Sequence, residues 1–476
     1  MTLDALVVGA GPNGLAAAIA LARAGRSVRV IEARDTVGGG CRTAELTLPG
    51  VQHDVCSAIH PLGRSSPFFR ELPLERHGLE WIEPPVQIAH PLDDGSAAVV
   101  RRDIATTTAS FADPRDAARY ERWIGPMARD WEVIVRELLG PIRPLAPLRH
   151  PLALARFGLP ALLPGMALAR AFRSPAARAL IAGCAAHSFL PLSAPISAGF
   201  GLALLVSAHA VGWPIPRGGS QRIADALASV LRELGGEIET GRTVASLREL
   251  PAYGAALLDL TPRQVLALAG DRLRGGYAAQ LRRYRYGPAT FKLDLVLDGP
   301  IPWRNPEVGL AGTVHLGGTA EEVATSERAV GHGRVSDRPF VLLSQPGSFD
   351  STRAPKGRHV VWSYCHVPNG WTGDATERIE RQIERFAPGF RDRIVARHVM
   401  MPADLEAYNA NYVGGDINGG LMHWAQFLTR PALRWDPYST PDARIFICSA
   451  STPPGGGVHG LCGWHAARSA LRGALR

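Results

Sequence analysis

The chain has 476 residues, of which 46% are hydrophobic and 20% are charged, so it is long enough to bury two sizeable domains. The formal net charge is +9, but the only lysines are Lys292 and Lys356, and no basic stretch is interleaved with aromatic residues. We therefore expect no nucleic-acid partner. The six cysteines have neither C-x-x-C pairs nor zinc-ligand spacing, so we expect no metal site and reduced thiols in a cytoplasmic protein.

A glycine-rich turn near the start of the chain separates two predicted strands. Residues 5–8 predict a buried strand, residues 13–24 an alanine-rich helix, and residues 28–31 a second strand. The turn has G-x-G-x-x-G spacing, and an acid follows its last glycine after eighteen residues. This order of strand, turn, helix, strand and acid is the fingerprint of a dinucleotide site. The expected cofactor-binding residues are Gly9, Ala10, Gly11, Pro12, Asn13, Gly14, Glu32, Ala33 and Arg34.

Each residue type in the fingerprint has its own physical role. Gly9 permits the tight turn, Gly11 leaves room for a pyrophosphate to approach the backbone, and Gly14 lets the helix pack closely on the strand. The helix N-terminus presents free N–H groups and a positive dipole end to the phosphates. Glu32 can accept hydrogen bonds from ribose hydroxyls, and its charge disfavours the 2′-phosphate of NADP.

The residues after Glu32 favour FAD over NAD. Gly38 and Gly39 complete an E-x-x-x-x-x-G-G pattern, which resembles the FAD-binding module of glutathione-reductase-like and amine-oxidase-like flavoproteins. In amine oxidases an arginine usually follows the doublet, whereas here Gly40 stands at that position and Arg42 comes two residues later. The resemblance implies that Arg42 takes over a phosphate contact.

The next segments are predicted to lead out of the cofactor domain. Residues 45–61 indicate a strand, a turn and a returning strand, and residues 67–110 alternate short strands with turns. Apolar residues at helical spacing predict a helix over residues 116–139. His60, just before Pro61, is interpreted either as a site residue or as a hydrogen-bonded histidine of a turn.

Residues 138–224 contain no acid, while arginines alternate with apolar and proline-rich runs. A transmembrane span is disfavoured, because the uncharged stretch 179–216 contains histidines, serines and prolines. Two other interpretations stay open: a peripheral contact with an anionic membrane, and helices of a substrate domain that are buried on one side and coated with arginine on the other. In either case the segment is expected to form the entrance or wall of an apolar substrate cavity.

Periodicity predicts further elements in the second half of the chain. A helix over residues 221–234 returns the chain to the cofactor domain, and residues 255–260 form another buried strand. Residues 287–299 alternate as a strand, with Phe291 on the apolar face and Lys292 on the other. Lys292 is interpreted either as a site residue or as a solvated lysine. Candidate pocket-lining residues are Tyr364, His366, Trp371, Tyr408, Tyr412, His423 and Trp424.

The C-terminal end repeats the order of strand, glycine loop and helix, over residues 444–448, 449–460 and 461–475. Together with the start and the doublet, its S-T-P-P-G-G-G-V-H-G stretch resembles the phytoene-desaturase-like FAD oxidoreductases. That resemblance implies non-covalent FAD and oxidation by removal of a hydride from carbon. It also implies that the terminal loop lies beside the isoalloxazine and the pyrophosphate, through Ala450, Gly456, Gly457 and Val458.

The same resemblance assigns three more positions. The backbone of Val244 would meet the adenine ring, and His60 would lie near the flavin. In amine-oxidase-like flavoenzymes a lysine on a strand at this point in the order holds a water near flavin N5, which assigns that role to Lys292. His60 and Lys292 are therefore the candidate catalytic residues.

We thus expect an α/β protein with a glutathione-reductase-like Rossmann FAD-binding domain, a second mixed sheet and a helical substrate domain. The expected function is removal of a hydride from an apolar small molecule, as in desaturases, dehydrogenases and oxidases, with O2 or a quinone as electron acceptor. An amine-oxidase-like oxidase, a non-catalytic FAD-binding protein, a homodimer and a peripheral membrane contact are kept as alternatives. The expected FAD-binding domain comprises residues 1–90, 213–283 and 421–476, and the expected substrate domain comprises residues 91–212 (helical from 116) and 284–420 (the sheet part).

Overall fold

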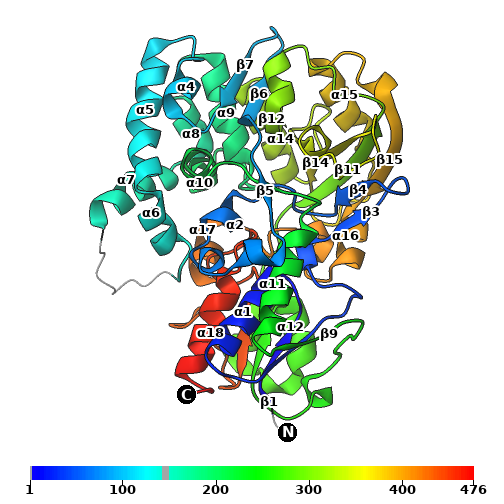
Figure 1. Ribbon diagram of the computed structural model, residues 1–476. Coiled ribbons are helices and arrows are strands. Elements are labelled where there is room, and N and C mark those ends of the chain that lie inside the picture. Colours follow the sequence, from blue (N-terminus) through cyan, green and yellow to red (C-terminus); the bar gives the residue numbers. More distant parts are fainter. Residues whose placement is uncertain (1–2, 142–149) are drawn as a thin grey trace.

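The computed structural model describes residues 3–141 and 150–476, which form two packed bodies (Figure 1). The lower body in that view contains a five-stranded parallel sheet with the strand order β16-β10-β1-β2-β9. Segments far apart in the sequence therefore meet in one sheet. Its strands are β1 (Leu3–Val8), β2 (Val28–Ile31), β9 (Glu237–Glu239), β10 (Tyr253–Leu258) and β16 (Ile445–Ile447).

Helices cover both faces of this parallel sheet, which explains why its strands are short apolar runs. One face packs against α1 (Pro12–Arg23), α11 (Gln221–Glu233) and α18 (Leu461–Arg472). The other face packs against α12 (Pro262–Ala269) and α13 (Gly275–Arg282). This is the Rossmann-type architecture that the fingerprint predicted, and that prediction is confirmed.

The upper body contains a second sheet, mixed and seven-stranded, with the order β15-β11-β14-β13-β12-β6-β7. Only β6 and β12 pair in parallel, and every other pair in this sheet is antiparallel. β6 starts before residue 90, the expected end of the first cofactor-domain segment. The strands are β6 (Val86–Pro91), β7 (Ala97–Val100), β11 (Ala289–Leu297), β12 (Ala311–Leu316), β13 (Val341–Ser344), β14 (His359–Val367) and β15 (Ile394–Met400).

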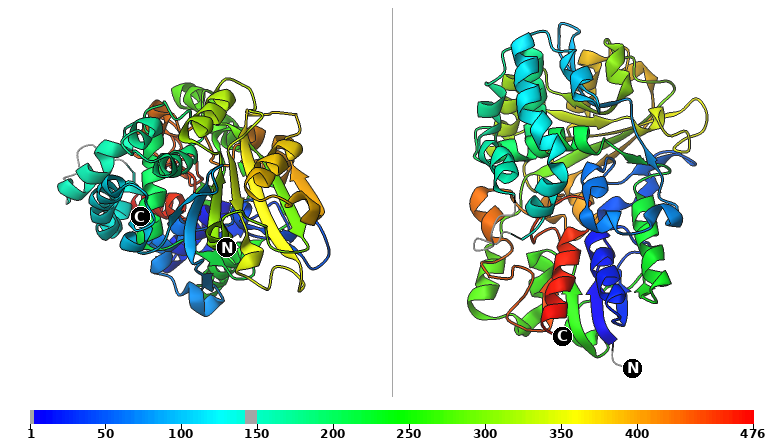
Figure 2. Two further views of the ribbon diagram at one scale, coloured as in Figure 1. Left: turned by 90° about the horizontal axis from the view of Figure 1, so that it is seen from above. Right: turned by 60° about the vertical axis from the view of Figure 1, so that its left-hand side comes forward.

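Helices flank this second sheet as well (Figure 2). On one side lies α15 (Thr376–Phe386), which packs its isoleucines onto the sheet, and α14 (Ala320–Gly331) packs against the helical part. The predicted helix over residues 116–139 is split in two, with Asp130 between its halves. The helices on the other side are α4 (Ile104–Thr108), α5 (Pro114–Arg129), α6 (Trp131–Leu138), α7 (Pro151–Ala161), α8 (Gly165–Ala169), α9 (Pro175–Ala186) and α10 (Ser197–Ala210).

The acid-free segment forms helices α7 to α10, while its residues 142–149 lie outside the described part of the chain. α9 and α10 are mostly buried between the sheet and the other helices. α7 is different, because Leu152 and Leu159 are 63% and 69% exposed. Within the described ranges, no helix combines the length and the apolar character that a bilayer crossing requires.

The alternating strand around Lys292 is buried on both faces. β11 lies between β14 and β15, and all nine of its residues are buried. Its polar face, which carries Lys292 and Asp294, packs against protein and not against water. The interpretation of Lys292 as a solvated lysine is therefore wrong. The alternating pattern of the strand shows which residues share a face, but the burial of that face depends on packing between distant segments, which the pattern does not report.

Short elements fill the region between the two bodies. Two small antiparallel pairs of strands, β3 with β4 and β5 with β8, lie there together with four short helices. These elements position the loops that line the site. They are β3 (Thr43–Glu45), β4 (Gln52–Asp54), β5 (Trp81–Ile82), β8 (Ile215–Pro216), α2 (Pro61–Ser65), α3 (Pro67–Arg70), α16 (Pro402–Tyr408) and α17 (Trp424–Thr429).

Candidate active site

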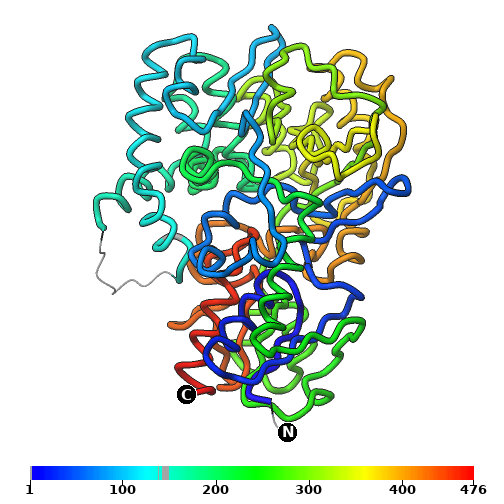
Figure 3. Tube along the Cα trace, viewed as in Figure 1, coloured from blue at the N-terminus to red at the C-terminus, as the bar shows by residue number. Residues whose placement is uncertain are grey.

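A cavity of about 780 Å³ lies between the two bodies and is lined from both. This volume falls within the range of roughly 300–1,000 Å³ that is usual for ligand pockets. The first and last segments of the chain meet beside it, since α1 and α18 lie side by side (Figures 1 and 3). Their approach is close: a Cβ on Gly463 of α18 would lie 1.7 Å from the carbonyl oxygen of Asn13.

In the glycine loop before α1, the geometry of Gly9 and Gly14 agrees with the roles expected of them. Gly9 has a φ of +102°, which L side chains rarely adopt, and so it permits the tight turn. A Cβ on Gly14 would lie 2.0 Å from the carbonyl oxygen of Gly9, so only glycine allows α1 to approach the strand this closely. A Cβ on Gly11 would lie 2.7 Å from Asp259 Oδ2, an acid that the sequence patterns did not single out.

Glu32 is held in a fixed orientation at the end of β2. Its Oε2 accepts a hydrogen bond from the N–H of Ala10 at 2.7 Å, and its Oε1 accepts from the N–H of Arg34 at 3.0 Å. Arg42 donates to the same Oε1 at 3.1 Å and to the carbonyl oxygen of Thr36 at 2.7 Å. Arg42 thus helps to orient the expected ribose-binding acid, and its phosphate contact stays a prediction.

Most of the expected cofactor-binding residues line the cavity. They are Gly9, Gly11, Pro12, Asn13, Glu32, Ala33, Arg34, Gly39, Arg42, Val244, Ala450, Gly457 and Val458. Four others lie behind this wall and shape it: Ala10, Gly14, Gly38 and Gly456. For example, the N–H of Gly38 donates to the carbonyl oxygen of Ala10 at 2.8 Å, which ties the glycine doublet to the first loop.

The upper end of the cavity has a largely apolar and aromatic wall. Trp213 fixes its ring by donating from Nε1 to Thr313 Oγ1 at 2.8 Å. Of the seven predicted pocket-lining residues, Tyr364, Tyr408 and Tyr412 line the cavity, whereas His366, Trp371, His423 and Trp424 do not. The upper wall is formed by His187, Leu204, Trp213, Thr313, Leu342, Trp362, Tyr364 and Ile417.

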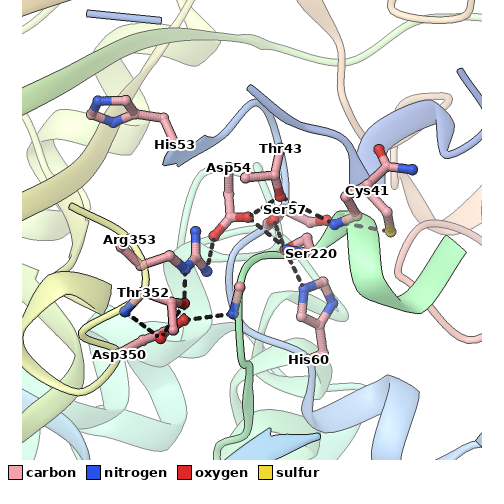
Figure 4. A network of polar contacts seen from close by, with 12 residues as sticks. Cys41, Thr43, His53, Asp54, Ser57, His60, Ser220, Asp350, Thr352 and Arg353 are labelled. Carbon is pink, nitrogen blue, oxygen red and sulfur yellow. Dashed lines mark hydrogen bonds and ion pairs between the residues drawn. The ribbon is translucent and has the colours of Figure 1, made fainter. Parts of the chain in front are cut away.

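His60 lines the cavity and belongs to a buried polar network that joins the two bodies (Figure 4). His60 Nε2 lies 2.8 Å from Ser220 Oγ, whose hydroxyl donates to the carbonyl oxygen of Ser57 at 2.5 Å. Since that hydroxyl has a single proton, Ser220 must accept from His60 Nε2–H, which leaves Nδ1 unprotonated. Among the described residues, Nδ1 has no hydrogen-bond partner.

The rest of this network holds Ser220 in place, and burial keeps His60 neutral. The N–H of Ser220 donates to Asp54 Oδ1 at 2.7 Å, and the Arg353 guanidinium binds Asp54 Oδ2 at 2.8 Å and Asp350 at 3.0 Å. Burial lowers the pKa of His60 to about 4, so the imidazole is neutral at physiological pH. One nitrogen of His60 is thus hydrogen-bonded in the fold and the other has no partner among the described residues, while the role of His60 as a site residue stays a prediction.

Lys292 does not line the cavity but lies directly behind one of its aromatic side chains. Its ammonium is 6.0 Å from the centre of the Trp362 ring and forms an ion pair with Asp294. Asp294 also lies 3.7 Å from His53 Nδ1 and 3.9 Å from His398 Nδ1. Burial alone would raise the pKa of Asp294, but the Lys292 charge together with His398 and His53 outweighs burial and holds that pKa below its ordinary value.

Comparisons with known proteins agree with this geometry. The family model of an NAD(P)-binding Rossmann-like domain matches residues 7–72. The chain is 27% identical to pyridine nucleotide-disulfide oxidoreductase domain-containing protein 2 of Mus musculus, covering 98% of this chain and 93% of the relative. It is 26% identical to a phytoene dehydrogenase of Streptomyces griseus, covering 82% and 77% of the two chains.

A solved structure extends the comparison to the fold. Cyclohexylamine oxidase from Brevibacterium oxydans superposes with a TM-score of 0.59 at 17% identity, covering 99% of each chain. At this identity the likeness concerns the fold alone. The resemblance indicated by the motifs is confirmed: the chain is similar in sequence to phytoene dehydrogenases and desaturases, and its fold is similar to that of an amine oxidase.

Proposed function

We propose that the protein binds FAD non-covalently in the cavity and oxidises an apolar organic molecule by removal of a hydride from carbon. The observation that carries this proposal is the cavity itself. A dinucleotide fingerprint lines one end, aromatic side chains line the other, and the terminal loop borders the space between them. The relatives named as dehydrogenases and desaturases support the same reaction class.

The residues present fit FAD. The glycine loop and the first turn of α1 line the cavity and suit a pyrophosphate, because the N–H groups at the start of a helix favour an anion. Glu32 suits a ribose, and Val244 lines the cavity, which supports the adenine contact that we propose for it. FAD, when bound, supplies the hydride acceptor. Trp213, Trp362 and Tyr364 would exclude water and orient an apolar substrate.

His60 is the residue that we propose as the proton acceptor of this site. Loss of a hydride from a carbon is completed by loss of a proton from a neighbouring atom, and the unprotonated nitrogen of a histidine that lines the cavity can take that proton. Ser220 positions it by accepting from Nε2–H, which directs the lone pair to Nδ1. Because the pKa of His60 is about 4, this role predicts a rate that is constant through neutral pH and falls below about pH 5.

Anaerobic mixing of the FAD-loaded protein with a panel of apolar alcohols, amines and alkenes tests this function. We expect at least one compound to bleach the flavin absorbance, and His60→Ala to slow that bleaching at least about a hundredfold while FAD stays bound. His90→Ala is the matched control, since His90 is also buried with a pKa of about 4 but does not line the cavity.

Three outcomes of that experiment would count against the proposal. If the purified protein carries no FAD, the proposed function is wrong altogether. Bound FAD that no compound in a broad panel reduces would favour a non-catalytic flavoprotein. Equal effects of the two histidine substitutions would show that His60 acts only through the fold.

With an active substrate, release of hydrogen peroxide in air would identify O2 as the electron acceptor, and its absence would favour a quinone or a protein partner.

We also propose that the exposed leucines around α7 contact an anionic membrane. Leu159 and Leu162 are 69% and 62% exposed, and Arg156 on α7 is exposed and forms an ion pair with Asp130 at 3.4 Å. Apolar side chains next to arginines suit an anionic lipid surface. Liposomes of phosphatidylglycerol should carry the protein in flotation at low salt and release much of it at high salt.

The matched variant for that experiment replaces both leucines, Leu159→Ser with Leu162→Ser. We expect this double variant to float less at low salt while its bound FAD is unchanged, because α7 does not line the cavity. Wild-type protein that stays with the soluble fraction at low salt would remove the membrane proposal.

A further inference from the structure

Asp259 lies directly beneath the glycine loop. It follows the last residue of β10, and its Oδ2 accepts a hydrogen bond from the N–H of Gly14 at 3.0 Å. The same oxygen lies 2.7 Å from where a Cβ of Gly11 would stand, and Asp259 Cβ lies 3.1 Å from where that of Gly9 would stand. The acid thus fills the space that the glycines leave, and it lines the cavity at the start of α1.

No cation among the described residues compensates this carboxyl. The titratable groups that interact with it are Glu32 at the end of β2, Cys448 after β16 and Cys462 on α18. Burial raises the pKa of Asp259 to about 7, the Gly14 N–H lowers it, and the negative charge of Glu32 raises it. Near neutral pH, the group is therefore divided between its neutral and its charged form.

A charged Asp259 would disfavour the binding of a pyrophosphate at the glycine loop. A pyrophosphate at the N-terminus of α1 is anionic, and two like charges close together in a buried site repel strongly. The neutral acid removes this conflict, because its second oxygen can then donate a hydrogen bond. Oδ1 is free for this, since no donor among the described residues binds it, whereas Oδ2 is occupied by Gly14.

We propose that Asp259 is a further cofactor-binding residue, which holds the FAD pyrophosphate as a neutral carboxylic acid. Oδ2 continues to accept from the N–H of Gly14, and Oδ1–H donates to a phosphate oxygen. This inference rests on the proposed binding of FAD. Where Asp259 is ionised in the free protein, FAD binding takes up one proton from solvent, and no other covalent bond is made or broken.

The proposal has a definite pH dependence. Bound pyrophosphate favours the protonated form, so FAD raises the pKa of Asp259 further and binding is linked to proton uptake. Below about pH 7 the acid is already protonated and the affinity for FAD is constant. Above that value the affinity falls by up to about tenfold per pH unit, because one proton must be supplied.

Titration of the apoprotein with FAD, followed by quenching of flavin fluorescence between pH 6 and pH 9 at constant ionic strength, tests this inference. For the wild type we expect a flat Kd up to about pH 7 and then a rise of up to about tenfold per unit. For Asp259→Asn we expect tight binding at every pH, since an amide keeps the shape and donates without ionising. Calorimetry at pH 8 in two buffers should show uptake of about one proton by the wild type and none by the variant.

The outcomes separate this inference from the proposed function. A wild-type Kd that does not change with pH overturns the role of Asp259, and so does an Asn variant with the same pH profile as the wild type. Failure of the wild type to bind FAD at any pH would instead overturn the proposed function. If the variant does not fold, the wild-type profile and its proton uptake decide the question without it.

Discussion

Gly11→Val is expected to abolish FAD binding. The first atom of the new side chain would lie 2.7 Å from Asp259 Oδ2 and 4.0 Å from the Cα of Gly39, and the valine branches would extend further. Asp259 cannot yield easily, because its carboxylate is held by the Gly14 N–H. The loop would have to move away from the position in which its N–H groups face the cavity.

The purified variant should therefore lack the flavin absorbance of the wild type and should not regain it when FAD is added. Gly276→Val is the matched control, since a Cβ there meets nothing within 4 Å and the residue does not line the cavity. That control should bind FAD like the wild type. A Gly11→Val protein with a full complement of flavin would contradict the placement of the cofactor at this loop.

Lys292→Met is expected to lower the free energy of unfolding by about 3–5 kcal/mol, the usual cost of removing one partner of a buried ion pair. Asp294 is fully buried, and Lys292 is the cation that compensates it. The folded pKa of Asp294 is depressed, so the pair stabilises the protein above the unfolded pKa of 3.8 and loses that contribution as the pH falls through the folded value. Urea unfolding at neutral pH and in acid measures both effects.

The same substitution should slow reoxidation of the reduced flavin by O2 at least about tenfold, which corresponds to roughly 1.4 kcal/mol of barrier. We propose that the Lys292 ammonium, which lies behind Trp362, stabilises the negative charge that develops at the bound flavin during reoxidation. Reduction by substrate should change less. Stopped-flow mixing of the reduced protein with oxygen gives the rate directly.

A double variant separates the two consequences of losing the lysine. Lys292→Met with Asp294→Asn removes both charges, so it should recover much of the stability and keep the slow reoxidation. If the double variant reoxidises at the wild-type rate, Lys292 serves only to neutralise Asp294. A dehydrogenase that passes its electrons to a partner would then be the better description.

The sequence was most informative where the determinants are neighbours in the chain. Residues 5–32 contain a strand, a turn, a helix, a second strand and the acid, and each of these depends on local spacing, such as the positive φ of Gly9. The first two strands of the parallel sheet, α1 and the position of Glu32 were therefore predictable. The terminal loop was predictable for the same reason, because its strand, glycines and helix are contiguous.

Tertiary structure alone decided what surrounds these elements. Asp259 lies 245 residues from the Gly14 N–H that it binds, and no pattern in the sequence pairs them. The alternation of β11 placed Lys292 and Asp294 on one face, but β14, β15 and His53 determine that this face is buried and charge-paired. His60 was a candidate from the sequence, whereas its free nitrogen depends on Ser220, 160 residues away. Burial and charge compensation come from contacts between distant segments, and a local pattern does not carry that information.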